Sequence, residues 1–294
     1  MPPLQGVAFN RDVHVFRERV FSNGSDPEMT DTIVKAVGLA RDDAGGATPG
    51  PGARRRVSPV VPAGIPVRVA TSVMERNRLV SGMKDQRVLD AYSLLRSRIL
   101  HRVKQNNITT LGITSPSPRD GKSLTATNLA ISIALGENLP VLLVDADVRR
   151  PSIADLFHLN INVGLGDYLV DDAELDEMIL QPPINGLYFV PGRAKSRLRP
   201  EALSSDKVTR LIGELKQRVP GGLIICDMPP ALVGGDVVAF APNLDATLLV
   251  VADRRTQEAD MEKVMPLMEG VNVIGTVLNF ADQTVSKNDY YGGR

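Results

Sequence analysis

The chain has 294 residues, enough for one large or two ordinary domains, and 43% of them are hydrophobic, which is enough to build a core. Lysine plus arginine and aspartate plus glutamate number 34 each, so composition argues against nucleic acid as a partner and against wholesale binding to an acidic surface. The single cysteine, Cys226, excludes an internal disulfide framework. Because the chain also shows no secretory signal and no apolar run of about 20 residues, we expect a cytoplasmic protein.

The first part of the chain carries the weakest structural signals. Helix-like spacing of apolar residues within 12–21 and 30–40 predicts an N-terminal segment, residues 1–41, that is weakly helical or mobile. Residues 42–83 begin with a proline- and glycine-rich stretch that runs to Pro66. Such a composition buries too little apolar surface to offset the entropy of ordering, so we predict a linker there.

Residues 84–285 show the pattern of one α/β domain. An amphipathic helix over Gln86–Val103 leads into it, and short apolar runs then alternate with helical stretches. The expected strands are Ile108–Thr114, Val141–Val144, Leu187–Val190, Leu223–Cys226, Ala246–Val251 and Val273–Leu278, and further helices are expected to begin at Lys122, Ser204 and Gln257. Runs that are apolar throughout are typical of parallel strands covered on both faces. We therefore predict a mostly parallel, doubly wound sheet.

A candidate phosphate-binding loop follows the first of these strands. It runs from Ser115 to Ser123, ends in Gly121-Lys122-Ser123 and leads directly into a helical run, the order of elements found in P-loop nucleoside triphosphatases. Backbone N–H groups and the helix dipole would surround the phosphates, Lys122 would reach the β and γ phosphates, and Ser123 would offer a hydroxyl to Mg²⁺. Pro116 stands where the general pattern has glycine, and an ordinary helix start is the competing interpretation. The expected nucleotide contacts are Pro118, Arg119, Asp120, Gly121, Lys122, Ser123 and Leu124.

Two other strands end in acids. Asp145 and Asp147 follow one apolar run, and Asp227 follows another and precedes Met228 and two prolines. The carboxyl ends of parallel strands are where open α/β sheets bind ligands. We expect these carboxylates to hold Mg²⁺ directly or through water, and one of them to accept a proton from an attacking hydroxyl. A helix-capping turn or a surface turn remains the competing interpretation.

These motifs resemble those of a known family, the bacterial tyrosine kinases of exopolysaccharide and capsule systems. The resemblance runs from Lys84 to Arg294 and is closest to the autokinases of exosortase-linked exopolysaccharide loci. It is carried by the loop, by Leu142–Pro151, by Leu223–Pro230, by Pro191-Gly192 with Pro200-Glu201-Ala202-Leu203, and by Gly275–Asn279.

The resemblance implies roles for particular residues. Lys122 would bind phosphate and Ser123 the metal, Asp145 would be the catalytic base, Asp147 and Asp227 would organise Mg²⁺, and Asn279 would contact the adenine of ATP. The tyrosine-bearing tail, residues 286–294, would supply the phospho-acceptors Tyr290 and Tyr291. The family commonly carries Glu-x-x-Arg-x-x-Arg on an interface helix, where this chain has Asp90, Ser93 and Arg96.

The resemblance also implies partners. We expect homo-oligomers that phosphorylate one another's tails, and a transmembrane chain-length regulator of polysaccharide export, a co-polymerase, that would place the kinase at the inner face of the plasma membrane. No other membrane contact and no nucleic acid is expected. The alternatives are an ATPase switch of the chromosome-partitioning and septum-placement type, and a nucleotide-binding adaptor with little turnover. Against the switch, Ser117 stands where such ATPases have an additional lysine.

Overall fold

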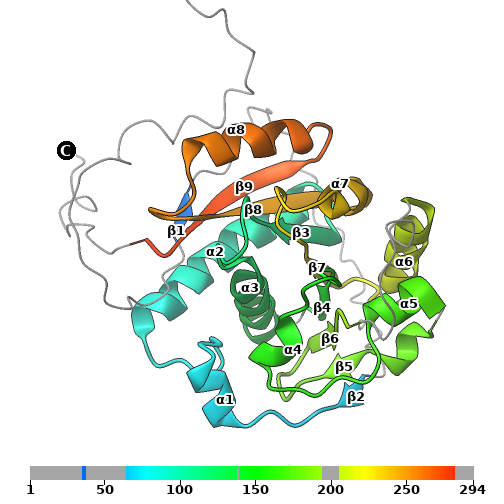
Figure 1. Ribbon diagram of the computed structural model, residues 1–294. Coiled ribbons are helices and arrows are strands. Elements are labelled where there is room, and N and C mark those ends of the chain that lie inside the picture. Colours follow the sequence, from blue (N-terminus) through cyan, green and yellow to red (C-terminus); the bar gives the residue numbers. More distant parts are fainter. Residues whose placement is uncertain (1–34, 38–63, 138, 172, 194–204, 282–294) are drawn as a thin grey trace, which may run out of the picture.

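A single large sheet organises the protein (Figure 1). The structure is a computed structural model, and it describes residues 35–37, 64–137, 139–171, 173–193 and 205–281. Within these residues the sheet has nine strands in the order β1-β9-β8-β3-β7-β4-β6-β5-β2. The predicted tail tyrosines, Tyr290 and Tyr291, and most of the N-terminal segment lie outside the described residues.

The six central strands are parallel, which confirms the predicted fold class. They are β3 (Thr110–Thr114), β4 (Val141–Asp145), β6 (Leu187–Val190), β7 (Leu223–Asp227), β8 (Ala246–Ala252) and β9 (Val273–Asn279). Because the strands run in the same direction, their carboxyl ends meet at one edge of the sheet. The acids that close β4 and β7 are therefore neighbours, and Asp145 is the register partner of Asp227.

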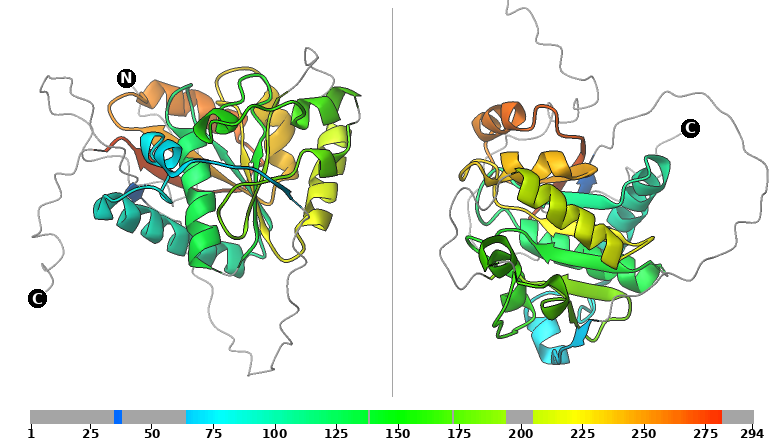
Figure 2. Two further views of the ribbon diagram at one scale, coloured as in Figure 1. Left: turned by 90° about the horizontal axis from the view of Figure 1, so that it is seen from below. Right: turned by 90° about the vertical axis from the view of Figure 1, so that its right-hand side faces the viewer.

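Helices cover both faces of the sheet (Figure 2). Those that the sequence predicted are α2 (Gln86–Gln105), α3 (Lys122–Gly136), α6 (Ser205–Arg218) and α8 (Glu258–Leu267). Successive residues of a strand point to opposite faces. Leu143 therefore packs in the core formed with α2 and α3, while Leu142 packs in the core formed with α6 and α8. A strand buried on both sides has no polar face, which explains the unbroken apolar runs.

Shorter elements that the sequence did not reveal fill the connections. They are α4 (Ile153–Leu156), α5 (Leu165–Asp171), α7 (Asp236–Phe240), the 3₁₀ helices η2 (Leu175–Glu177) and η4 (Ala241–Asn243), and β5 (Leu180–Gln181), which pairs antiparallel to β6. Each spans too few residues to show a clear periodic pattern. Of these, α4 and α7 matter most for the site, because each begins shortly after an acid-bearing strand.

Two predictions for the first part of the chain are wrong in detail. Lys35–Val37, in the segment predicted to be weakly helical or mobile, is the strand β1, which pairs antiparallel with β9. The predicted linker extends too far, since Ile65–Pro66 forms β2 and Thr71–Arg76 forms the helix α1. Leu79, just after α1, is fully buried in the core. The free edge of β9 fixes β1, and an uncovered face of the core fixes the segment around Leu79. A short stretch of sequence shows neither of these partners.

No helix among the described residues has both the length and the apolar content to cross a membrane.

Candidate active site

The loop between β3 and α3 is held in shape from within and from a neighbouring strand. The amide of Ala231, which follows β7, donates to the carbonyl of Ser115 at 2.8 Å. Inside the loop, the amide of Ser117 donates to Asp120 Oδ2 at 2.8 Å. Gly121 has a φ of 90°, a left-handed conformation that glycine adopts without steric cost. The loop thus has the tight turn into a helix that phosphate cradling requires.

The predicted nucleotide contacts differ in exposure along this loop. Pro118 and Arg119 are exposed, Gly121, Ser123 and Leu124 are half-buried, and Asp120 and Lys122 are buried. Burial raises the pKa of Asp120, although its hydrogen bond from Ser117 opposes that shift.

The Lys122 side chain reaches from the start of α3 to the ends of two strands. Its Nζ lies 3.0 Å from Asp147 Oδ2 and 3.3 Å from Asp227 Oδ1, and it donates to Ser123 Oγ at 3.2 Å. Only 8% of the side chain is exposed. Burial lowers the pKa of Lys122, but the carboxylates of Asp227 and Asp147 outweigh burial, so the pKa is raised and the amine stays charged. The structure therefore brings together the loop lysine and acids from two separate stretches of chain.

Asp145 ends β4 and is fully buried. Its Oδ2 accepts hydrogen bonds from the amides of Ser152 at 2.9 Å and Ile153 at 3.0 Å, where α4 begins. Its Oδ1 is buried and has no hydrogen-bond partner. Burial, and then repulsion from Asp227, raises the pKa of Asp145 well above its usual range. A carboxyl group with one free oxygen and a raised pKa is suited to taking up a proton at neutral pH.

Asp227 and Asp147 complete the cluster. Burial raises the pKa of Asp227, with Lys122 opposing that shift, and Asp227 Oδ2 also lacks a hydrogen-bond partner. Asp147 Oδ2 faces Lys122, while its Oδ1 accepts from the amide of Arg150 at 3.2 Å. Buried polar atoms without partners are costly. The free oxygens of Asp145 and Asp227 therefore mark a place for a ligand.

The oxygen donors of this cluster suit Mg²⁺. Carboxylate and hydroxyl oxygens are hard ligands, and Mg²⁺ in nucleotide sites keeps several waters and takes only one or two carboxylates besides phosphate oxygens. No three histidine, cysteine, aspartate or glutamate side chains in the described ranges form a ready-made metal cluster. Water and phosphate oxygens would therefore have to complete the shell of an ion bound here. Coordination by Ser123, Asp145, Asp147 and Asp227 stays a prediction.

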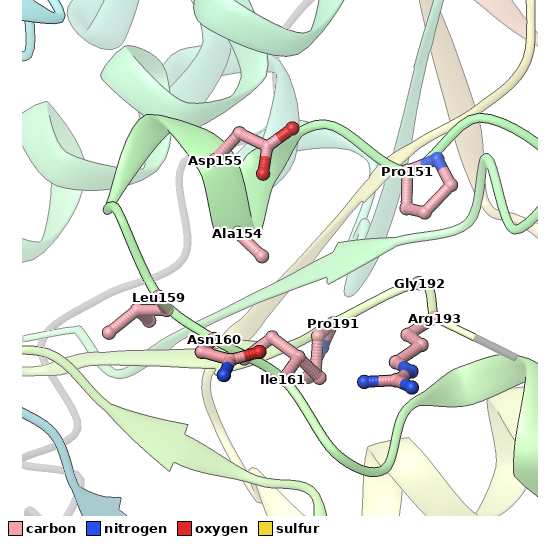
Figure 3. Close-up of a pocket in the computed structure, with 9 residues that line it drawn as sticks. All are labelled: Pro151, Ala154, Asp155, Leu159, Asn160, Ile161, Pro191, Gly192 and Arg193. Atoms are coloured by element: carbon pink, nitrogen blue, oxygen red, sulfur yellow. The ribbon is translucent and has the colours of Figure 1, made fainter. Parts of the chain in front are cut away.

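A cavity of about 230 Å³ lies near the carboxyl ends of β4 and β6 (Figure 3). It lies between the segment 151–161, which follows β4, and Pro191–Arg193, which follows β6. Gly192 forms the contact between cavity and acid, since a Cβ there would lie 2.7 Å from the Asp145 carbonyl oxygen and 3.0 Å from its carboxyl carbon. Arg193 and Asn160 contribute polar groups to the lining, as Figure 3 shows.

Asn279, predicted to contact adenine, is fully buried at the end of β9. Its Nδ2 donates to the Asp120 carbonyl at 3.0 Å, and its Oδ1 accepts from the Phe280 amide at 3.0 Å. The side chain therefore contacts the phosphate-binding loop, and its contact with adenine stays a prediction.

One ion pair beside the site was not predicted. Arg149, in the loop after β4, pairs with Asp236 at the start of α7, so the segments that follow β4 and β7 are tied together. The two residues are 87 positions apart, and no local sequence pattern links them.

Comparisons with known proteins place this arrangement in context. No family model matches the chain. It is 30% identical over 204 residues to the tyrosine-protein kinase CpsD of Streptococcus agalactiae, a match that covers 68% of this chain and 87% of CpsD. It is 32% identical over 178 residues to the tyrosine-protein kinase ptk of Acinetobacter johnsonii, covering 60% of this chain but only 24% of that longer relative.

The fold shows the same similarity. The kinase domain of the Escherichia coli tyrosine kinase ETK matches with a TM-score of 0.60 and 25% sequence identity, over 68% of this chain and 78% of that domain.

Proposed function

Because the chain belongs to the family of bacterial tyrosine-protein kinases, we propose that it transfers the γ-phosphoryl group of ATP to protein tyrosines, chiefly Tyr290 and Tyr291 on neighbouring copies. The observation that carries this proposal is the cluster at the carboxyl edge of the sheet. There the Lys122 amine lies between Asp147 and Asp227, and a free oxygen of the buried Asp145 lies on the neighbouring strand.

Binding of the triphosphate uses the loop and Lys122. The loop amides and the positive end of α3 receive the phosphates, and Lys122 exchanges its two carboxylate partners for β- and γ-phosphate oxygens. The Lys122 side chain is only 8% exposed, and its amine would be costly to bury unpaired. The exchange keeps it paired both before and after nucleotide binds, so binding leaves no buried charge without a partner.

Movement of Lys122 toward phosphate releases Asp147 and Asp227. Those two carboxylates, with Ser123 and with Asp145 through water, would then hold Mg²⁺, which neutralises charge on the phosphates. The free Oδ2 of Asp227 supports this assignment. A buried carboxylate oxygen without a hydrogen bond destabilises the fold unless a ligand binds it.

Asp145 is the proposed base. The tyrosine hydroxyl oxygen forms the new bond to the γ-phosphorus, the bond from that phosphorus to the bridging oxygen breaks, and ADP leaves. The hydroxyl proton passes to Asp145 Oδ1, the oxygen that has no hydrogen-bond partner. The amides of Ser152 and Ile153 fix the carboxyl group through its other oxygen, so it does not have to be reoriented during the step.

The cavity beside Asp145 is the proposed side of approach for the acceptor. Gly192, which lines the cavity, packs against Asp145, so an acceptor held in the cavity would be separated from the base by that glycine. In-line transfer would require the acceptor to reach the acids from the side opposite the phosphates.

The biological setting is proposed from the same resemblance. The protein would act on exopolysaccharide polymerisation and export, self-associate, and work at the cytoplasmic face of the plasma membrane through a transmembrane co-polymerase. The narrower similarity to exosortase-linked autokinases stays a prediction.

The direct test uses purified protein with radiolabelled ATP and Mg²⁺, with and without the cytoplasmic segment of the partner. We expect label on tyrosine, located by mass spectrometry at Tyr290 or Tyr291, and no label in Lys122→Ala. Lys263→Ala, which changes an exposed lysine on α8, is the matched control and should label normally. Absence of phosphotyrosine under both conditions would remove the kinase proposal.

The same assay separates the alternatives. ATP hydrolysis without phosphotyrosine would favour the ATPase switch, and tight nucleotide binding without either reaction would favour the adaptor. Ser117 stands where a switch ATPase has lysine, and this counts against the switch.

A further inference from the structure

Two side chains hold the outer side of the phosphate-binding loop. Asn279 Nδ2, at the end of β9, donates to the carbonyl of Asp120 at 3.0 Å, and Arg255 Nη1, which follows β8, donates to the carbonyl of Arg119 at 3.1 Å. The two carbonyls are consecutive in the chain. The loop is therefore bound from outside at the two peptide groups that directly precede Gly121.

The residues that make these bonds are themselves fixed. Asn279 is fully buried, and its Oδ1 accepts from the Phe280 amide at 3.0 Å. Phe280 has a φ of 59°, a left-handed conformation that is strained for a phenylalanine and must be held by its surroundings. The Arg255 guanidinium lies 5.7 Å from the centre of the Phe280 ring. We call Asn279, Phe280 and Arg255 the loop brace.

The geometry of the peptide bond gives the brace a consequence for ligand binding. In a trans peptide the C=O and N–H of one unit point in opposite directions. Holding the Arg119 and Asp120 carbonyls toward the brace therefore turns the Asp120 and Gly121 amides away from it. Those amides belong to the loop that is expected to cradle the phosphates.

Gly121 fits the brace closely. A Cβ at this position would lie 1.8 Å from Asn279 Nδ2, far inside any allowed contact. The absence of a side chain at Gly121 thus allows Asn279 to approach the Asp120 carbonyl, in addition to allowing a φ of 90°.

We propose that Asn279 is a positioning residue for phosphate binding, which with Arg255 aims the Asp120 and Gly121 amides at the phosphates of any bound triphosphate. This inference rests on the nucleotide-binding part of the proposed function and is independent of transfer to tyrosine. A positioning role of this kind differs from recognition of the adenine base, the role that the sequence predicted for Asn279. A residue that reads adenine affects only ligands that carry adenine, whereas a brace affects every triphosphate.

The test compares Asn279→Ala with the unchanged protein by calorimetry and competition binding, with three magnesium complexes as probes. ATP carries adenine, inosine triphosphate carries a different base, and inorganic tripolyphosphate carries none. We expect all three affinities to fall by about tenfold, the effect of one lost buried hydrogen bond, with their ratios unchanged. A loss confined to ATP, or no loss, would overturn the inference.

Asn272→Ala is the matched control. Asn272 lies before β9 at the opposite edge of the sheet and donates through the same atom to a backbone carbonyl, that of Asp245, at 2.8 Å. It should lower thermal stability without changing the binding of any probe. If Asn279→Ala melts below the assay temperature, Asn279→Ser, which is too short to reach Asp120, is expected to show the same parallel loss.

A double-mutant cycle with Gly121→Ala tests the contact itself. Gly121→Ala weakens ATP binding because the new methyl group strikes the Asn279 amide and because alanine is strained at this φ. In that background Asn279→Ala removes the clash, so it should cost less than it does in the unchanged protein. Strictly additive losses would contradict the brace. A protein that binds triphosphates as expected but forms no phosphotyrosine would refute the kinase proposal alone.

Discussion

The two edges of the sheet treat an aspartate in opposite ways. At the amino edge, just before β8, Asp245 accepts from the amides of Thr109 at 2.7 Å and Thr110 at 2.9 Å and from Lys216 Nζ at 3.1 Å. Burial raises its pKa, but these hydrogen bonds outweigh burial and lower the pKa to about 2. At the carboxyl edge, Asp145 keeps one oxygen without a partner, and its pKa is raised.

This difference teaches how one sheet separates stability from chemistry. A carboxylate whose oxygens are satisfied fixes the ends of strands and stabilises the fold. A buried carboxylate with a free oxygen destabilises the fold and remains available to a ligand. The following substitutions test that contrast, beginning with the one expected to have the largest effect.

Lys122→Met should reduce both the rate of phosphotransfer and the free energy of unfolding more than any of the substitutions below. Phosphotransfer is expected to fall by about a thousandfold or more, because the charge facing the phosphates is lost. Asp147 and Asp227 are left buried without their cation, so the free energy of unfolding at pH 7 should fall by about 3 kcal/mol. It should recover on acidification as the Asp227 carboxyl, whose pKa is raised by burial, becomes neutral. Chemical denaturation across pH measures this, and a loss that does not depend on pH would contradict the interpretation of the cluster.

Asp145→Asn should separate activity from stability. We expect kcat to fall by about a hundredfold to ten-thousandfold with ATP affinity retained, because the base is lost. The folded pKa of Asp145 is raised, so ionisation opposes folding increasingly as pH rises above the ordinary aspartate pKa and through the raised value. The variant should therefore melt higher than the unchanged protein at pH 7. Lower melting together with normal kcat would show that Asp145 is structural.

Gly192→Ala should displace Asp145 while leaving its carboxyl group unchanged. The added methyl group would lie 2.7 Å from the Asp145 carbonyl oxygen, so β4 or the cavity wall must shift. We expect kcat to fall by about tenfold, since small displacements of catalytic groups are costly. Gly213→Ala is the control, because a Cβ there meets no atom within 4 Å and the exposed position lies inside α6. It should stabilise the protein by about 0.5 to 1 kcal/mol and leave kcat unchanged.

Asp245→Asn should have the smallest effect and no effect on kcat. The Asp245 side chain is 31% exposed, so after allowance for solvent screening we expect a loss of about 1 kcal/mol of unfolding free energy at pH 7. Its folded pKa of about 2 lies below the ordinary value of 3.8, so its contribution is present above pH 3.8 and disappears as pH falls toward 2. Urea unfolding at both pH values measures the difference. A change in kcat would contradict the assignment of Asp245 to stability alone.

Most of the central fold follows from local pattern. Each of the six central strands begins and ends within two residues of its predicted range, because apolar runs such as Val141–Val144 can be satisfied only between two covering layers. The edge strand β1 could not be predicted, because Lys35–Val37 becomes extended only where the edge of β9 offers hydrogen bonds. The linker predicted over residues 42–83 extends too far because composition does not show that Leu79 meets an open core face.

The site divides in the same way. Sequence alone determined which residues are candidates for the site. Lys122 follows Gly121 at the end of the phosphate-binding loop, and Asp145, Asp147 and Asp227 close or follow apolar strands. Only the tertiary structure decided what those residues and their neighbours contact. Asn279 meets the Asp120 carbonyl across 159 positions of chain, and Arg149 meets Asp236 across 87. The periodicity that identifies a strand acts over a few residues, whereas these contacts exist only once the strands have been ordered and packed side by side.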